Sequence, residues 1–292
     1  MTHPFTYARP VSIAEASERL GAPGARAMGG GTDLLSQLQR GIRPADEVVD
    51  VRSAVPAGIL AAGPGIRIGA ATRIADVARD PDVIARFGAL AQASAAVASP
   101  QLREMGTVAG NLCQAVRCWY FRHPDLTCWL RGGETCYAQI GDHRKHGLEP
   151  GDCISVAPSD LAAALLALDA VVTTDRRDGF PLADLYRKAS AENRSTLALE
   201  QGELIVAVTV PVAPEASAYA RAGERAAWSF ALCGVAAARF AGGTRLAAIG
   251  VSNLPRLLDP ADPLAGLPGL EMTGWKRGML QALAEDALAA VA

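Results

Sequence analysis

The sequence lacks a charge excess of either sign. Lys and Arg number 28 and Asp and Glu number 30, which leaves a formal net charge of −2 over 292 residues. Proteins that hold a phosphate backbone normally carry a basic excess and a basic stripe. The sequence shows neither, so we expect no nucleic acid partner.

Long apolar runs are also missing. The longest candidate, residues 161–172, contains Asp169 and is well short of the ~20 residues that a transmembrane helix needs. Residues 1–9 show no basic region followed by an apolar stretch, which a secretory signal peptide would have. The sequence therefore predicts a cytoplasmic chain with no membrane partner. Export to the periplasm on a partner's signal is left open.

Aromatic residues are few, at 5% of the chain, but hydrophobic residues reach 50% and charged residues 20%. This composition excludes a disordered chain, and the length is enough for two domains. Short strands and helices alternate in the first part of the chain, and longer strands followed by one helix fill the rest. We therefore predict an α+β protein with one domain at 1–175, in subdomains of about 1–55 and 56–175, and a smaller α+β domain at 176–292.

The hydrophobic periodicity and the capping residues predict individual elements. The expected strands are 25–28, 47–51, 66–70, 170–174, 204–210, 228–239 and 245–251. The expected helices are one that starts at 32–33, one at 74–78 capped by Thr72, one at 84–97, one at 161–168 and one at 275–291. Between them, residues 101–111 are expected to be extended.

Three consecutive glycines, Gly29 to Gly31, lie between an expected strand and an expected helix. Without a Cβ, their backbone N–H groups can converge on one point ahead of a helix N-terminus, which suits a phosphate or pyrophosphate. The turn matches neither the P-loop nor the spaced-glycine Rossmann fingerprint, and a tight turn that only needs positive φ is the alternative. A second element, residues 106–111 (GTVAGN), by itself also fits a bulged hairpin. Two such turns in one domain favour a dinucleotide, which has two phosphates.

Four segments in order resemble the FAD subunits of the molybdenum hydroxylases, the xanthine dehydrogenase and carbon monoxide dehydrogenase flavoprotein family. They are 5–10, 27–35 (AMGGGTDLL), 68–72 and 101–111 (QLREMGTVAGN). The resemblance continues through 158–169 and, weakly, through 219–235, so it covers most of the chain. It implies a PCMH-type (vanillyl-alcohol-oxidase-like) FAD-binding fold. Because no His or Cys is placed at the first glycine turn as an attachment point, we expect the FAD to be bound noncovalently.

In that family the two glycine turns bind the FAD pyrophosphate and neighbouring groups, and an aspartate matching Asp160 lies beside the flavin. Two departures are Ala109, where the family often has glycine, and Arg221, where lysine is common. The resemblance implies no catalytic residue. The FAD-binding residues that it implies are Met28, Gly29, Gly30, Gly31, Thr32, Asp33, Leu34, Ile68, Gly69, Ala70, Thr107, Val108, Ala109, Gly110, Asn111, Asp160, Ile205 and Arg221.

Cysteine is rare outside one irregular segment, residues 113–153, which holds five of the six cysteines. The segment reads as an inserted loop, and clustered cysteines in a reducing compartment suggest metal or redox chemistry. Spacings of 10, 8 and 17 separate Cys118, Cys128, Cys136 and Cys153. Because zinc ribbons and ferredoxins prefer Cys-x2-Cys pairs, spacing alone leaves both free thiols and iron–sulfur ligation open.

The residues around these cysteines resemble a subset of the same family: the 4-hydroxybenzoyl-CoA reductase β-subunit and the FAD subunit of certain bacterial aldehyde oxidoreductases. That subset carries an additional 4Fe–4S cluster in a cysteine loop. The resemblance implies that the cluster ligands are Cys118, Cys128, Cys136 and Cys153. Cys113 and Cys233 are expected to be core thiols.

Three functions are consistent with this pattern. The resemblance implies an electron-transfer subunit that carries FAD and a 4Fe–4S cluster. Its partners would be a molybdopterin-binding large subunit and a 2Fe–2S small subunit, in a heterotrimer or its dimer. The alternatives are a stand-alone FAD and iron–sulfur oxidoreductase with its own small substrate, and a redox sensor.

Overall fold

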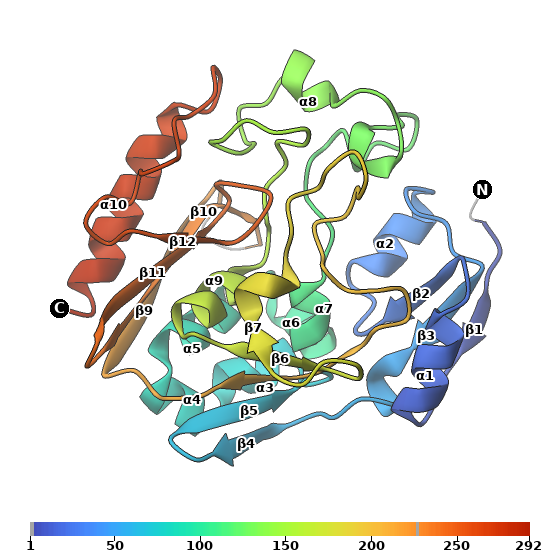
Figure 1. Ribbon diagram of the computed structural model, residues 1–292, viewed down its shortest axis with the longest axis horizontal. Coiled ribbons are helices and arrows are strands. Elements are labelled where there is room, and N and C mark those ends of the chain that lie inside the picture. Colours follow the sequence, from blue (N-terminus) through green and yellow to red (C-terminus); the bar gives the residue numbers. More distant parts are fainter. Residues whose placement is uncertain (1–2, 226–227) are drawn as a thin grey trace.

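The computed structural model describes residues 3–225 and 228–292, which form three β-sheets with helices packed on them (Figure 1). The described part of the chain has no helix that is long and apolar enough to span a bilayer.

The N-terminal sheet is small and parallel, in the order β1-β3-β2. It confirms the expected strands near 25–28 and 47–51 and the helix after the three glycines. Ser12 caps α1, because its side chain accepts from the amide of Glu15 at 3.2 Å. The elements in chain order are β1 (Thr6–Ala8), α1 (Ile13–Leu20), β2 (Ala25–Met28), α2 (Leu34–Gln39), β3 (Glu47–Asp50) and the 3-10 turn η1 (Val51–Ser53).

The central sheet has five strands in the order β4-β5-β8-β6-β7, and neighbouring strands are antiparallel. Because β8 lies in the middle of this sheet, the expected domain boundary at 175/176 would cut the sheet. The structure changes from one sheet to the next only after Val210. The elements are β4 (Ile59–Ala62), β5 (Gly65–Gly69), β6 (Val171–Thr174), β7 (Phe180–Pro181), η3 (Leu182–Leu185) and β8 (Ile205–Val210).

Helices between β5 and β6 differ from the sequence prediction in three places. Arg73, not Thr72, is the N-cap of α3, since the Thr72 hydroxyl is hydrogen-bonded to Gly58. The expected helix at 84–97 is two helices that meet at Phe87, and the expected extended chain at 101–111 is two short helices separated by Gly106. The helices are α3 (Ile74–Arg79), α4 (Pro81–Arg86), α5 (Gly88–Ala96), α6 (Pro100–Met105), α7 (Val108–Leu112) and α9 (Asp160–Ala167).

The C-terminal sheet is antiparallel, in the order β12-β11-β10-β9, and β9 was not predicted. Alternate residues of β10 face opposite sides: Val235 and Ala237 share a core with α10, whereas Ala236 and Ala238 share one with α9. Every residue of α9 is buried, as expected of a helix that is apolar all round. The elements are β9 (Ala216–Gly223), β10 (Ala231–Phe240), β11 (Gly243–Ile249), β12 (Arg256–Leu258) and α10 (Trp275–Ala289).

Residues 113–153, hereafter the cysteine segment, lie outside the three sheets, in green at the top of Figure 1. Apart from η2 (Trp129–Arg131) and α8 (Tyr137–Ile140), the segment is irregular. It therefore depends on side chains, more than on regular backbone hydrogen bonding, for its shape.

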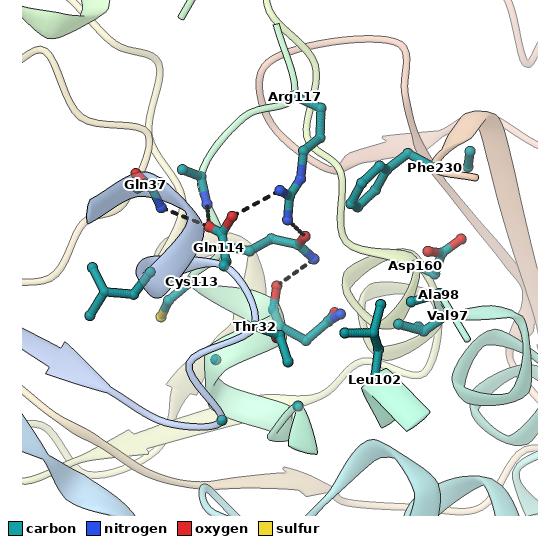
Figure 2. A pocket seen from close by; sticks show the side chains of 18 of the residues that line it. Thr32, Gln37, Val97, Ala98, Leu102, Cys113, Gln114, Arg117, Asp160 and Phe230 are labelled. Carbon is teal, nitrogen blue, oxygen red and sulfur yellow. Dashed lines mark hydrogen bonds and ion pairs between the residues drawn. The ribbon is translucent and has the colours of Figure 1, made fainter. Parts of the chain in front are cut away.

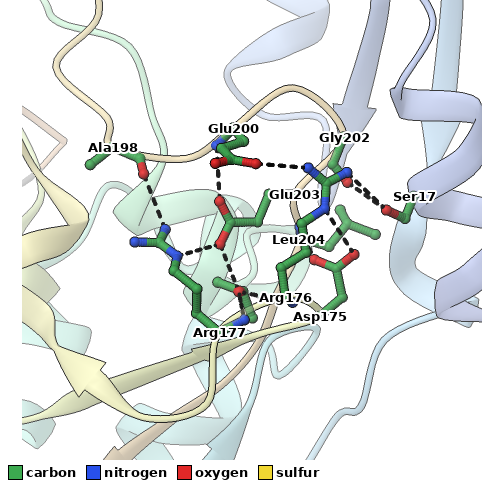
Figure 3. A network of polar contacts seen from close by, with 10 residues as sticks. Ser17, Asp175, Arg176, Arg177, Ala198, Glu200, Gly202, Glu203 and Leu204 are labelled. Atoms are coloured by element: carbon green, nitrogen blue, oxygen red, sulfur yellow. Dashed lines mark hydrogen bonds and ion pairs between the residues drawn. The ribbon is translucent and has the colours of Figure 1, made fainter.

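A network of charged side chains joins α1 to the central sheet (Figure 3). The carboxylate of Glu203 accepts from Thr174 Oγ1 and Arg177 Nε, both at 2.7 Å, and from the amide of Glu200 at 2.9 Å. On the α1 side, Ser17 Oγ donates to the backbone oxygen of Gly202 at 2.9 Å. The network fixes the N-terminal sheet, which carries the first glycine turn, onto the central sheet.

Candidate functional site

A pocket of about 780 Å³ opens between the two glycine turns (Figure 2). Its walls come from the turn after β2, from α6 and the start of α7, from the beginning of the cysteine segment, and from residues 228–232 at the start of β10. Small-molecule and cofactor pockets occupy roughly 300–1,000 Å³. This pocket is therefore the candidate cofactor site.

The first glycine turn lies directly against the second. A Cβ added to Gly30 would lie 1.8 Å from the backbone oxygen of Met105, and one added to Gly29 would lie 2.5 Å from Thr107 Oγ1. Gly31 has a φ of +72°, which side-chain-bearing residues rarely adopt. Gly29 and Gly30 are therefore required by the close approach of the second turn, and Gly31 by its backbone conformation. All three line the pocket.

The second glycine turn is fixed to the central sheet. The amide of Ala109 donates to the backbone oxygen of Ala70, the residue after β5, at 3.1 Å. Thr107 caps α7, because its Oγ1 accepts from the amide of Gly110 at 3.2 Å. The first amides of this short helix are therefore paired within the protein, and the turn lines the pocket with Thr107, Gly110 and Asn111.

Asp160, the first residue of α9, brings a carboxyl group to the pocket (Figure 2). Its Oδ1 accepts from the Tyr219 hydroxyl at 2.6 Å and lies 3.3 Å from Arg221 Nε. Burial raises the pKa of Asp160, although the positive charge of Arg221 acts in the opposite direction. Ser159 donates to Asn111 Oδ1 at 2.6 Å, which joins the start of α9 to the second glycine turn.

The FAD-binding residues expected from the sequence fall into two groups. Those that line the pocket are Gly29, Gly30, Gly31, Thr32, Asp33, Leu34, Thr107, Gly110, Asn111 and Asp160. Those that lie outside its lining are Met28, Ile68, Gly69, Ala70, Val108, Ala109, Ile205 and Arg221. Most of the second group are buried behind the turns, where they support the residues that do line the pocket.

Asp33 lines the pocket, but its carboxylate is directed to the cysteine segment. Its Oδ1 lies 2.8 Å from Arg117 Nη1 and 2.8 Å from Arg122 Nη2, and its Oδ2 accepts from the amide of Ala115 and from Gln37 Nε2, both at 2.9 Å. Burial alone would raise the pKa of Asp33, but the two arginines outweigh it and hold the pKa below its usual value.

The four cysteines expected to be cluster ligands line one small cavity of about 10 Å³: Cys118, Cys128, Cys136 and Cys153. Aromatic side chains complete its walls, namely Tyr120, Phe121, Trp129 and Tyr137. All six cysteines of the chain are free. Within residues 3–225 and 228–292, no three His, Cys, Asp or Glu side chains converge on a point where they could hold a single metal ion.

Cys118 borders both cavities, since it lines the pocket between the glycine turns as well as the cysteine cavity. Its Sγ lies 3.2 Å from His146 Nε2, and His146 also lines the larger pocket. Burial raises the pKa of the Cys118 thiol to about 12 and lowers the pKa of His146 to about 4. Without a bound metal, the pair is therefore a neutral thiol beside a neutral imidazole at pH 7.

Residues 3–213 match the family described as FAD binding domain in molybdopterin dehydrogenase. The chain belongs to this family. The aldehyde oxidoreductase FAD-binding subunit PaoB of Escherichia coli K12 is 37% identical over 274 residues, which span 88% of this chain and 85% of that protein. The carbon monoxide dehydrogenase medium chain of Hydrogenophaga pseudoflava is 34% identical over 112 residues, 37% of this chain and 39% of its own.

Solved structures agree on the fold of this molybdopterin dehydrogenase family member. A carbon monoxide dehydrogenase structure from Hydrogenophaga pseudoflava superposes with a TM-score of 0.72 at 21% identity, covering 100% of this chain and 98% of that one. Quinoline 2-oxidoreductase from Pseudomonas putida 86 gives a TM-score of 0.67 at 19% identity, covering 97% and 86%. The expected family, oxidoreductase class and mixed helix–sheet fold are confirmed. The family match ends at residue 213, close to the sheet change after Val210.

The pocket of this FAD-binding protein is also lined by two arginines close to the first glycine turn in the sequence, which the sequence analysis did not single out. Arg26 lies on β2 and Arg43 precedes β3. Burial lowers the pKa of Arg43 to about 10, with Arg26 acting in the same direction, so its guanidinium still carries its charge at pH 7. Cations next to a glycine turn fit the negative charge of a pyrophosphate. The two residues belong to separate segments with no characteristic spacing, so no sequence signal marks them.

The other two cysteines differ from each other. Cys233 on β10 is fully buried in the core beneath α10, as expected. Cys113 packs against the central core but also lines the flavoprotein's pocket (Figure 2), and burial raises its thiol pKa to about 12. Cys113 is therefore a neutral wall residue of the pocket and lies outside the cysteine cavity.

Proposed function

We propose that this chain is the FAD- and 4Fe–4S-containing electron-transfer subunit of a molybdenum hydroxylase-type complex. In this proposal it passes electrons between iron–sulfur clusters of its partners and an external acceptor or donor. The observation that carries the proposal is the position of Cys118, which borders both the pocket and the cysteine cavity. Two redox groups bound in these places would share a wall.

FAD fits the larger pocket on three grounds. The volume is sufficient, Gly29 to Gly31 line the pocket with backbone that carries no side chain, and Arg26 and Arg43 supply positive charge. Gly29 to Gly31, with Thr107, Gly110 and Asn111 of the second turn, would hold the pyrophosphate, and Asp160 would lie beside the flavin. Bound there, FAD supplies exchange between one-electron and two-electron chemistry. Asp160, fixed by Tyr219 and Arg221, would keep one hydrogen-bonding carboxyl group at a constant place.

The cysteine cavity offers the donor set that a 4Fe–4S cluster requires, four thiols within one apolar enclosure. In such a cluster each thiolate binds its own iron, so the sulfurs surround the cluster instead of converging on a single ion. The thiols must move apart to admit a cluster, because the cavity of about 10 Å³ has room for at most about one water molecule. The cluster would supply one-electron transfer. The aromatic rings around the four cysteines would exclude water from it.

The partners in this proposal are a molybdopterin-binding large subunit and a 2Fe–2S small subunit, in a heterotrimer or its dimer. The relatives support an assembly, since PaoB is described as an FAD-binding subunit and the carbon monoxide dehydrogenase relative as a medium chain. The six free cysteines fit the reducing cytoplasm.

Metal analysis of cysteine variants tests the cluster. Anaerobically purified protein should contain about four irons and four sulfides per chain. Changing any one of Cys118, Cys128, Cys136 and Cys153 to Ser should abolish or destabilise this content, because a hydroxyl is a hard ligand and poorly replaces a soft thiolate. FAD should remain, since the cysteine cavity makes none of the glycine-turn contacts.

Cys233→Ala is the matched control, and it should keep its iron at a packing cost of roughly 1–2 kcal/mol. Iron that falls in Cys233→Ala but persists in Cys153→Ser contradicts the ligand assignment, and zinc in place of iron contradicts the electron-transfer role. Purification from the native host tests the assembly: large and small subunits that copurify support it. Substrate turnover by the isolated chain supports the stand-alone oxidoreductase instead.

A further inference from the structure

The carboxylate of Asp33 joins two segments that are far apart in the sequence. Asp33 ends the first glycine turn, and its four hydrogen-bond donors include Ala115, Arg117 and Arg122 of the cysteine segment, 82 to 89 positions later. Its side chain is only 16% exposed. The donors occupy both carboxylate oxygens, which leaves little capacity for a ligand in the pocket.

Arg122 folds the start of the cysteine segment back onto Asp33. Its Nε donates to the backbone oxygen of Val116 at 3.0 Å, and its Nη2 donates to Ala115 O at 3.0 Å as well as to Asp33. One guanidinium therefore holds both the backbone of the segment and the carboxylate of the glycine turn.

Arg117 extends the same junction to two further walls of the pocket. Its Nη2 donates to Gln114 Oε1 at 2.7 Å, and its guanidinium lies over the Phe230 ring, 4.1 Å from the centroid (Figure 2). Cys118, which borders both cavities, follows Arg117 directly in the chain. A fixed Arg117 therefore limits where Cys118 can lie.

We propose that Asp33 is a positioning residue that fixes the start of the cysteine segment, and with it Cys118, against the first glycine turn. Its carboxylate is not an FAD ligand, in contrast to the expectation from sequence. The consequence for the distance between FAD and the cluster rests on the proposed function. The contacts of Asp33 with Ala115, Arg117 and Arg122 do not depend on it.

The test compares Asp33→Asn with Asp142→Asn in the full chain purified with its flavin. Asp142 is a matched control, because among the residues that the structure describes its carboxylate pairs only with Arg144, two residues away, and joins no distant segments. In Asp33→Asn the amide of Ala115 loses its charged acceptor, so its hydrogen exchange should be roughly tenfold faster. FAD content and exchange of the β10 amides should equal the wild type in both variants.

Three results would overturn the proposal. One is a loss of FAD in Asp33→Asn with unchanged exchange at Ala115, which makes Asp33 a flavin ligand. Another is faster exchange in β10 as well, which makes its role general stability. The third is unchanged exchange everywhere. Arg122→Lys keeps the positive charge but loses the fork of donors, so it should reproduce the faster exchange at Ala115.

Iron release to a chelator adds a readout that depends on the cluster. Asp33→Asn should release its iron several-fold faster than Asp142→Asn, because Cys118 is less firmly held, and equal rates count against the positioning of Cys118. If the wild-type chain holds no iron, the cluster proposal fails, and exchange at Ala115 still decides the role of Asp33.

Discussion

The pocket between the glycine turns and the cysteine segment are held together by different kinds of contact. Around the pocket, backbone meets backbone, as where Gly30 lies against the Met105 carbonyl. In the cysteine segment, long cationic side chains donate to backbone oxygens. Arg194 Nη1 reaches Trp129 O at 2.9 Å, and Lys276 Nζ reaches His146 O at 2.9 Å.

The kind of contact determines which amino-acid substitutions each region tolerates. A wall built by close backbone approach has no side chain that can move aside, so one added methyl group displaces a whole turn. In a segment that is held by side chains, the removal of one side-chain contact loosens only the few residues that the contact fixed. We therefore expect the pocket to respond steeply to glycine substitutions and the cysteine segment to respond gradually to the loss of single charges.

Gly30→Val should have the largest effect on FAD binding and stability of the substitutions considered. A small effect would contradict the view that close backbone contact builds the pocket. Its Cβ would lie 1.8 Å from the Met105 oxygen, and overpacking of this kind costs roughly 3 kcal/mol or more. The two turns must separate, so FAD binding should be lost. The clash is with the neighbouring turn, so the loss does not depend on a side chain reaching the pyrophosphate space.

Gly242→Val is the control for this substitution, since a Cβ at Gly242 meets nothing within 4 Å. It should bind FAD like the wild type, as measured by flavin absorbance after gel filtration. A Gly30→Val protein with full flavin content and wild-type stability would show that the turns are not in close contact.

The sequence predicted those features whose structure is determined by a short stretch of consecutive residues. Gly29 to Gly31 and the buried α9 are readable because a glycine run and an unbroken apolar stretch each permit few structures. The helices α6 and α7 were missed, since Gly106 divides them into pieces too short to show a period. The strand β9 was missed although alanine occupies every second position of it, because alanine is a weak strand former and gives little hydrophobic contrast.

Long-range side-chain contacts were beyond the sequence for another reason. The family resemblance implied an FAD-binding role for Asp33 but named no partner for its carboxylate. Its actual partners, Arg117 and Arg122, are identified only when the fold brings the cysteine segment to the glycine turn. Composition and spacing contain no information on which arginine meets which carboxylate.

A second pair of substitutions tests whether a buried side-chain contact stabilises the fold more than an exposed one. In the network of Figure 3, Glu203 is 1% exposed, whereas Glu200 is 78% exposed and pairs with Arg176 at 3.3 Å. Burial opposes ionisation of Glu203, but the hydrogen bonds from Arg177, the Glu200 amide and Thr174, with the charge of Arg177, together outweigh it and lower the pKa. Glu203→Gln should lower the free energy of unfolding by about 2–3 kcal/mol, because it leaves Arg177 without its anion.

Glu200→Gln is the matched control and should change the free energy of unfolding by less than about 0.5 kcal/mol. Urea denaturation of both variants, followed by circular dichroism, measures the difference. Equal effects would show that the number of contacts, and not their burial, sets the strength of such junctions.

The smallest expected effect concerns the sheet that carries the first glycine turn. Asp50 on β3 is paired with Met28, the residue before the three glycines, and its carboxylate accepts from Arg52 Nη2 at 2.7 Å and from the Tyr7 hydroxyl at 2.8 Å. Burial opposes ionisation, but the hydrogen bonds from Arg52 and Tyr7 prevail and lower the pKa of Asp50 to about 2. The carboxyl group therefore stays ionised in the folded chain at pH values where an unfolded chain, with a pKa of about 3.9, takes up a proton.

A lowered carboxyl pKa stabilises the fold above the pKa of the unfolded chain, and that contribution is lost as the pH falls toward the folded value. Asp50→Asn should thus cost about 1–2 kcal/mol at pH 7, and the difference from the wild type should shrink steadily from about pH 4 toward pH 2. Urea denaturation at a series of pH values measures it. A difference that is constant with pH would assign the effect to the NH₂ donor that Asn places against the donors Arg52 and Tyr7, and not to the carboxylate charge. The stability of the sheet that carries the first glycine turn would then not depend on the charge of Asp50, whereas the cysteine segment depends on charged side chains.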